Sequence, residues 1–145
     1  MAAPKRNYNL TPAESVIAIP AAGTYVGEVM KAPAGNSGGG WTLACLQSKF
    51  TRASGGTTLK AYLQTSFDDG ATWADVAAHA FATTTATKIS SINRSIAPAA
   101  QAFAPTDGTL TDDTIIQGVL GDRLRVKIVV VGTYVGTYRA DLVLN

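Results

Sequence analysis

Hydrophobic side chains recur at every second position along most of this chain, which is the spacing of β-strands rather than helices. The clearest run covers residues 58–67, and residues 73–81 answer it across a turn at residues 68–72. We expect one set of side chains in the first run to point into a core, namely Leu59, Ala61, Leu63, Thr65 and Phe67. The alternate set should point outward, namely Lys60, Tyr62, Gln64 and Ser66.

Similar runs elsewhere predict further strands. They cover residues 15–19, 25–31, 41–50, 88–96, 123–131 and 138–144, with residues 114–120 as a weaker candidate. Pro20 makes the first of these a short edge strand. Residues 97–105 mix Ala with Pro and fit either a helical turn or an extended crossing. About eight or nine short strands with turns between them predict an all-β fold, an antiparallel β-sandwich or jelly roll.

The length of 145 residues suits one domain. We expect an N-terminal arm at residues 1–12 and a single β-sandwich domain at residues 13–145. The arm is polar and contains Pro, so it is either a contact to a neighbouring subunit or a disordered tail. Its sequence lacks the apolar core of a signal peptide, and no apolar run reaches the ~20 residues that a membrane helix needs.

Charged residues make up 15% of the chain, with a formal net charge of +2. This is below the roughly 25% of ordinary globular proteins, so much of the surface must be neutral Ala, Thr, Ser and Gly, which favours contact with other proteins. The basic residues are scattered, which argues against nucleic-acid binding. Cys45 is the only cysteine, and no metal-ligand spacing occurs. No cofactor or metal is expected.

Catalysis has little support in the sequence. His79 is the only histidine, no nucleophile elbow is present, and Cys45 lies in an apolar strand. A structural histidine is therefore the favoured interpretation, and we expect no enzyme. Asp107-Gly108 and Asp112-Asp113 lack the spacing of a calcium loop, which favours turns.

Two further patterns concern the surface and the turns. Residues 23–27 and 132–136 both have the sequence Gly-Thr-Tyr-Val-Gly, which we interpret as two similar hairpin turns. Arg123, Arg125 and Lys127 share one face of a predicted strand. This basic stripe is either a contact for an acidic partner or a solvated face, and the sequence leaves both open.

The sharpest motif is the sequence Ser-Phe-Asp-Asp-Gly-Ala-Thr-Trp at residues 66–73. It resembles the Asp-box, S-x-D-x-G-x-T-W, of sialidases and other β-proteins. The chemistry is that of a turn, in which Asp68 accepts bonds from backbone N–H groups, Gly70 supplies a positive φ and Trp73 packs beneath. Its pattern residues are Ser66, Asp68, Gly70, Thr72 and Trp73. A single copy without paired catalytic carboxylates does not make a sialidase.

The longer stretch 59–81, followed by the Thr-rich residues 82–87, resembles a segment of small structural proteins of tailed bacteriophages. Their pattern is Y/V-x-L/V-Q-T-S-x-D-G-G-x-T-W-x-D-V-A, and Asp69 departs from it where Gly is usual. The resemblance implies a β-sandwich that assembles into the virion. It also implies one of three positions, namely capsid decoration (cement), the head–tail connection or the tail.

Of these positions, we expect decoration of the capsid surface. The charge-poor surface suits packing against many neighbours, and no coiled coil or repeat of a fibre is present. The implied partners are the major capsid protein and copies of the chain itself, often as trimers, assembled in the host cytoplasm. A head–tail connector or tail protein is the first alternative. The second is a carbohydrate- or receptor-binding module, for which Trp41 and Tyr62 would be exposed on one sheet.

Overall fold

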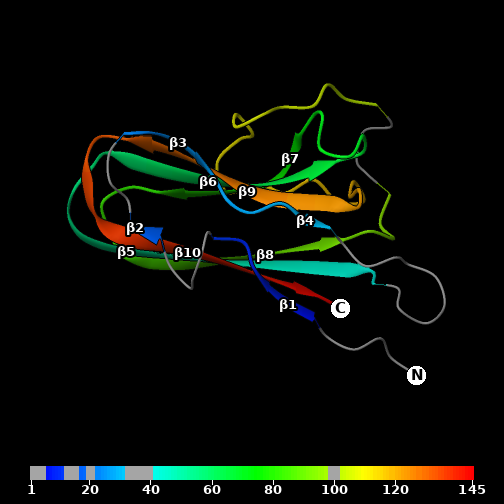
Figure 1. The fold of residues 1–145 in the computed structure, drawn as a ribbon, viewed down its shortest axis with the longest axis horizontal. Helices are drawn as coiled ribbons and strands as arrows, with labels where there is room; N and C mark the ends of the chain where they lie inside the picture. Colours follow the sequence, from blue (N-terminus) through cyan, green and yellow to red (C-terminus); the bar gives the residue numbers. More distant parts are fainter. Residues whose placement is uncertain (1–5, 12–16, 19–21, 32–40, 98–101) are drawn as a thin grey trace.

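The chain folds into two antiparallel β-sheets (Figure 1). The structure is a computed structural model that describes residues 6–11, 17–18, 22–31, 41–97 and 102–145. Within these ranges there is no helix, and therefore none that could cross a membrane. The strands there are β1 (Arg6–Asn9), β2 (Ile17–Ala18), β3 (Gly23–Val26), β4 (Met30–Lys31), β5 (Leu43–Gly55), β6 (Thr58–Ser66), β7 (Ala74–Phe81), β8 (Ala86–Asn93), β9 (Arg123–Val131) and β10 (Tyr134–Leu144).

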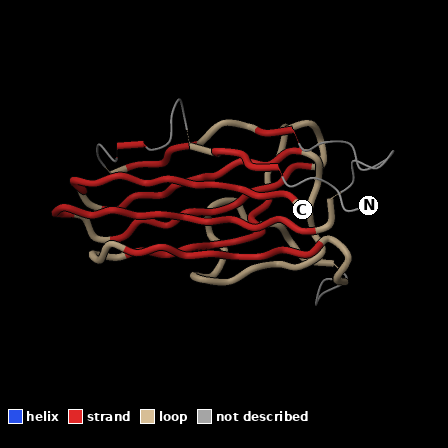
Figure 2. The backbone as a smooth tube through the Cα atoms, turned by 90° about the horizontal axis from the view of Figure 1, so that it is seen from below, coloured by secondary structure: helices blue, strands red, loops and turns tan. Residues whose placement is uncertain are grey.

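Each sheet is built from strands that are distant in sequence. Sheet A has the order β1-β10-β5-β8, and β2 also pairs with β10. Sheet B has the order β3-β9-β6-β7, and β4 also pairs with β9. The connections β5–β6, β7–β8 and β9–β10 each lead from one sheet to the other. The two sheets lie as layers one above the other, and Figure 2 shows the strands running along the length of the molecule.

The core lies between the two layers. Phe50 of sheet A is 5.3 Å from Phe81 of sheet B, measured between ring centroids, and 5.3 Å from Tyr134 in an edge-on arrangement. Aromatic pairs favour such tilted and edge-on geometries. Strands β9 and β10 contribute every second residue to this core, as period-two alternation requires. Burying one such large apolar side chain stabilises the fold by about 1.5–3 kcal/mol.

The central hairpin confirms one prediction and corrects another. Strands β6 and β7 pair antiparallel across the predicted turn. Phe67, however, was expected inside and is 66% exposed, because it lies one residue beyond β6, where strand alternation ends. Tyr62, Gln64 and Ser66 were expected outside and are buried. A later part of the chain lies over this face of β6, and the next subsection describes it.

Other predicted strands shift at their ends. The predicted strand 25–31 is two strands, β3 and β4. Gly27 lies between them, and a Cβ atom there would come 2.0 Å from the carbonyl oxygen of Leu10, so only Gly fits. The predicted strand 123–131 matches β9, and the run 138–144 extends back to Tyr134 in β10. Residues 114–120 contribute only an isolated bridge, between Ala77 and Ile115.

The predicted N-terminal arm is partly a strand. Residues 6–9 form β1 and pair with residues 141–144 of β10. Leu10 follows in the core, where it is 1% exposed, and its N–H donates to the carbonyl of Ala140 at 2.9 Å. The expectation that residues 1–12 lie outside the first strand is therefore wrong for residues 6–9, because Leu10 anchors them to sheet A. Residues 1–5 and 12 lie outside the described residues.

The two Gly-Thr-Tyr-Val-Gly copies have different roles. Residues 132–133 connect β9 to β10, with Gly132 at a φ of 81°, so the second copy begins as the predicted hairpin turn. The first copy forms strand β3, and its interpretation as a turn is wrong. Its pairing with residues 127–130 of β9 decides its conformation. Of the run 97–105, residues 98–101 lie outside the described part, and neither alternative is decided.

Candidate functional site

The Asp-box-like turn joins β6 to β7 and is held by its own side chains. Asp68 accepts from the backbone N–H of Thr72 at 2.9 Å, from the Thr72 hydroxyl at 2.6 Å and from the Ser66 hydroxyl at 2.8 Å. The Ser66 hydroxyl in turn accepts from the Gly70 N–H at 2.8 Å. Trp73 donates its indole N–H to the carbonyl of Gly70 at 3.0 Å. The pattern residues thus bond one another, as turn chemistry predicts.

The electrostatics and the backbone geometry of this turn are both those of a turn closed by hydrogen bonds. The hydrogen bonds from Thr72, followed by that from Ser66, lower the pKa of Asp68 to about 2. Gly70 has a φ of 89° and Asp69 a φ of 58°. Position 69 is the one where the sequence pattern quoted above usually has Gly. Asp is among the residues that tolerate this left-handed conformation.

The basic stripe of β9 lies on the outer face of sheet B and is bonded to the rest of the chain. Arg123 pairs with Asp69 at 3.0 Å. Lys127 pairs with Asp107 at 2.8 Å, which lowers the pKa of that carboxyl. The guanidinium of Arg125 lies 4.1 Å from the ring centroid of Trp73, the geometry of a cation–π contact.

Arg125 also donates from Nε to Gln64 at 2.8 Å. Burial lowers its pKa. All three basic groups therefore have partners within the chain.

Residues 102–118, which we call the covering segment, lie over the outer face of sheet B and along one side of it (Figure 1). One buried carboxylate bonds it at residues 106–110. Asp75 of β7 is 1% exposed and accepts from the backbone N–H groups of Gly108, Thr109 and Leu110 at 2.7, 3.0 and 3.2 Å. It also accepts from the Thr106 hydroxyl at 2.8 Å.

Gln64 of β6 completes this contact, donating to Asp75 at 2.8 Å and to Asp107 at 2.7 Å. The covering segment thereby buries Tyr62 and Gln64, two side chains of β6 that alternation placed outside.

The end of the covering segment closes the side of the molecule where β7 and β8 are the edge strands. Backbone bonds of 2.9 Å run from Ala78 to Thr114 and from Ile116 to Val76. Gln117 then bonds β8, accepting from the Asn93 N–H at 2.7 Å and donating to the Ser91 carbonyl at 3.2 Å. Its side-chain amide thus makes backbone bonds to β8 of the kind that a neighbouring strand would make. Covering of this kind protects these positions of the edge strands from pairing with other chains.

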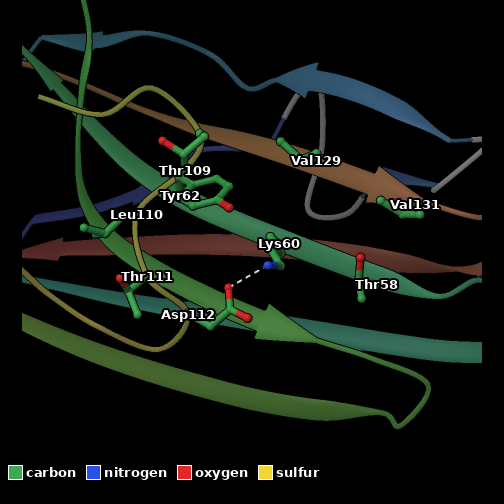
Figure 3. Close-up of a pocket in the computed structure, with 10 residues that line it drawn as sticks. Thr58, Lys60, Tyr62, Thr109, Leu110, Thr111, Asp112, Val129 and Val131 are labelled. Atoms are coloured by element: carbon green, nitrogen blue, oxygen red, sulfur yellow. Dashed lines mark ion pairs between the residues drawn. The ribbon is translucent and has the colours of Figure 1, made fainter.

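A groove of about 460 Å³ lies between the covering segment and sheet B (Figure 3). Its floor is formed by Thr58, Lys60 and Tyr62 of β6 with Val129 and Val131 of β9, and residues 108–112 form its wall. The ammonium of Lys60 pairs with Asp112 at 2.8 Å, and this hydrogen bond raises the pKa of Lys60. Burial raises the pKa of Tyr62. The groove thus combines two valine side chains, hydroxyl groups and one ion pair.

A second hollow, of about 250 Å³, lies beside the Asp-box-like turn. It is more apolar than the groove, and we call it the aromatic hollow. Its lining includes Phe67, Trp73, Phe103 and Val119. Phe67 is 66% exposed and Phe103 40% exposed. Two large apolar side chains therefore face solvent at one end of the molecule.

His79 connects the two sheets. Its Nδ1 lies 2.8 Å from the hydroxyl of Ser48, and its Nε2 lies 2.5 Å from that of Ser90. Ser48 also bonds the hydroxyl of Tyr138 at 2.7 Å. Both ring nitrogens thus face hydroxyl groups, and neither has the carboxylate partner of a catalytic triad. Burial lowers the pKa of His79, which favours the neutral ring.

The aromatic residues of the carbohydrate alternative do not form an exposed row. Trp41 is 6% exposed and Tyr62 is 3% exposed. The guanidinium of Arg94 lies 4.3 Å from the ring centroid of Trp41. Within the described ranges, no group of three or more His, Cys, Asp or Glu side chains is placed to hold a metal.

Comparison of the chain with protein-family models, with curated proteins and with solved structures finds no significant match. Sequence reasoning located the turn and the basic stripe, and it missed Asp75, Gln64 and the covering segment. Residues 102–113 have no hydrophobic periodicity and residues 114–120 have only the weak strand pattern noted above, so no pattern placed the segment over sheet B. The available signal was the cluster of turn residues Pro105, Asp107 and Gly108, which indicates a bent, polar stretch able to present N–H groups.

Proposed function

We propose that this protein is a structural protein of a tailed-bacteriophage virion, which binds the surface of the assembled head as a decoration protein. The resemblance of residues 59–81 to such proteins supports this function. So does the strand order. Taken as the two sheets of a sandwich, β1-β10-β5-β8 and β3-β9-β6-β7 follow the order of a jelly roll, an architecture of viral capsid domains.

The observation that carries the proposal is the aromatic hollow. Large apolar side chains that are exposed together mark contacts with other proteins. Phe67 and Phe103 face solvent beside Trp73 on a chain with 15% charged residues. The turn beside them is fastened by its own hydrogen bonds, so it presents Phe67 in a fixed position. Such a surface suits a preformed partner such as a capsid subunit.

The mechanism is mechanical. Copies of the chain, as trimers or singly, bind across junctions between subunits of the major capsid protein and bury apolar surface there. Each Å² removed from water contributes about 25 cal/mol, and many copies multiply the contribution over the shell. The decorated shell then resists the pressure of the packaged DNA. No catalysis and no cofactor enter this role.

Copy number tests the proposal. Purified particles are analysed by quantitative gel electrophoresis, and the 15.0 kDa chain is compared with the major capsid protein. A ratio near one supports decoration, and particles without the chain should then burst more readily. Six or twelve copies per particle would overturn decoration in favour of a neck or tail protein. Absence from particles would overturn the virion assignment itself.

A pair of variants tests the contact. Phe67→Ser should weaken binding of the purified chain to undecorated heads about tenfold or more, because interface aromatics carry a large share of binding energy. Val135→Ser is the matched control, since Val135 is 59% exposed and lies at the opposite end of the sheets. Co-sedimentation with heads measures both. Equal binding by the two variants would contradict a contact through the aromatic hollow.

A further inference from the structure

The groove between the covering segment and sheet B contains the hydroxyl group of a tyrosine whose ring is buried. Tyr62 is 3% exposed, and its hydroxyl, which has no hydrogen-bond partner among the described residues, opens into the groove. A tyrosine hydroxyl that has no partner in the protein bonds water, or a ligand that replaces the water. Because Tyr62 lines the groove, next to Lys60 on the same face of β6, its hydroxyl is available to a molecule that occupies the groove (Figure 3).

The other polar groups of the groove define what kind of molecule fits. Lys60 and Asp112 neutralise each other at 2.8 Å, so they give the groove no net charge that would select an anion or a cation. Thr58, Thr109 and Thr111 add further hydroxyl groups. A hydroxyl both donates and accepts, which matches the hydroxyl groups of a ligand better than a purely accepting or donating group.

We propose that this groove binds a neutral saccharide. The hydroxyl groups of Tyr62 and of the threonines, together with Asp112, bond the sugar hydroxyls, and the side chains of Val129 and Val131 contact its C–H face. The volume of about 460 Å³ lies in the range of small-molecule sites. This site is separate from the row of exposed aromatics considered for a carbohydrate module, because Tyr62 acts through its hydroxyl and not through an exposed ring.

The wall of the groove is fixed before any ligand binds. Residues 108–110 donate their N–H groups to the buried carboxylate of Asp75, and Lys127 holds Asp107 at 2.8 Å. A wall held in this way loses little conformational entropy on binding. The inference does not depend on the virion assignment, since it concerns only the groove of the isolated chain.

The test uses the purified full chain and a set of neutral monosaccharides and disaccharides, with a sugar phosphate and a short neutral peptide as comparison probes. Binding is measured by NMR titration of backbone amides. We expect millimolar or tighter binding of at least one neutral sugar, with shifts at residues 58–62 and 108–112. Tyr62→Phe should weaken it about three- to tenfold, the effect of one hydrogen bond. Tyr8→Phe, which removes a hydroxyl from β1 of the other sheet, should leave it unchanged.

Three results would overturn the proposal. The first is that no neutral sugar binds, and the second is that the peptide or the sugar phosphate binds in the groove in preference to them. The third is that Tyr62→Phe and Tyr8→Phe bind equally well. Amide spectra of both variants establish that they are folded. Failure of this test leaves the copy number in particles unaffected, so the two proposals are judged separately.

Discussion

The outer faces of the two sheets differ in what lies over them. On sheet A, the outward side chains of β5, such as Cys45 and Gln47, remain partly exposed. On sheet B, the corresponding side chains of β6, Tyr62 and Gln64, are almost completely buried. Both strands alternate in sequence in the same way. The difference comes from the covering segment, and it shows that alternation predicts which side of a strand a residue occupies but not whether that side meets water.

The polar side chains of the two outer faces also differ in how deeply they are buried. On sheet A, Arg139 and Asp141 form an outward pair at 2.6 Å that is partly exposed. On sheet B, Asp75 and Gln64 are buried beneath the covering segment. A buried carboxylate is tolerated only when hydrogen bonds replace its water. The same residue type should therefore matter much more on sheet B than on sheet A.

Removal of the buried carboxylate should have the largest effect. Asp75→Ala leaves the backbone N–H groups of residues 108–110 without their acceptor, and we expect a loss of about 3–5 kcal/mol in the free energy of unfolding. Asp141→Ala, on the open face, should cost about 1 kcal/mol or less. Urea denaturation of both variants measures the difference. Equal losses would mean that the covering segment does not distinguish the faces.

Two glutamine variants test the same difference between the faces, and we expect a smaller effect from them. Gln64→Ala removes bonds to Asp75, Asp107 and Arg125, and should cost about 1–3 kcal/mol. Gln47→Ala changes the same side chain on β5 of the open face and should stay within about 0.5 kcal/mol of the parent chain. The same denaturation experiment measures both. A cost for Gln47→Ala as large as that for Gln64→Ala would contradict the assignment of the network to sheet B.

The smallest effect concerns the exposed turn next to the covered face. Hydrogen bonds lower the pKa of Asp68 from 3.8 to about 2. A carboxyl with a lowered pKa stabilises the folded state fully above its ordinary pKa, and this contribution is lost as the pH falls from about 4 to about 2. NMR titration of the Asp68 carboxyl carbon should give a midpoint near 2, with faster exchange of the Thr72 amide at lower pH. A midpoint near 3.8 would refute the bonded turn, and Asp68→Asn should remove the pH effect.

Strands could be predicted from sequence where packing on the core alone determines their bounds and their buried side chains. Residues 123–131 alternate along their whole length, and β9 has those bounds. The predictions failed where distant contacts decide. Tyr62 is buried by a segment nearly 50 residues later in the chain, and Gly27 separates β3 from β4 because Leu10 approaches it closely. Neither contact leaves a local pattern.

The candidate sites were predictable to a similar degree. The turn around Asp68 is local, so its pattern residues could be read directly from residues 66–73. The basic stripe was placed on the correct strand, but its intramolecular partners Asp69, Asp107 and Trp73 come from other parts of the chain. The groove needs β6, β9 and residues 108–112 together. A site assembled from three separate segments has no signature within any one of them.

The position of β9 and β10 has a consequence for how the chain folds during synthesis. Strand β10 lies between β1 and β5 in sheet A, and β9 lies between β3 and β6 in sheet B. Until a ribosome has released residues 123–144, β1 and β3 have no neighbour, whereas the β6–β7 hairpin and the β5–β8 pair can already form. Pairing between segments so distant in sequence is slow. A nascent chain stalled before residue 123 would therefore expose the unpaired edges of β5 and β6, which could then pair with another chain.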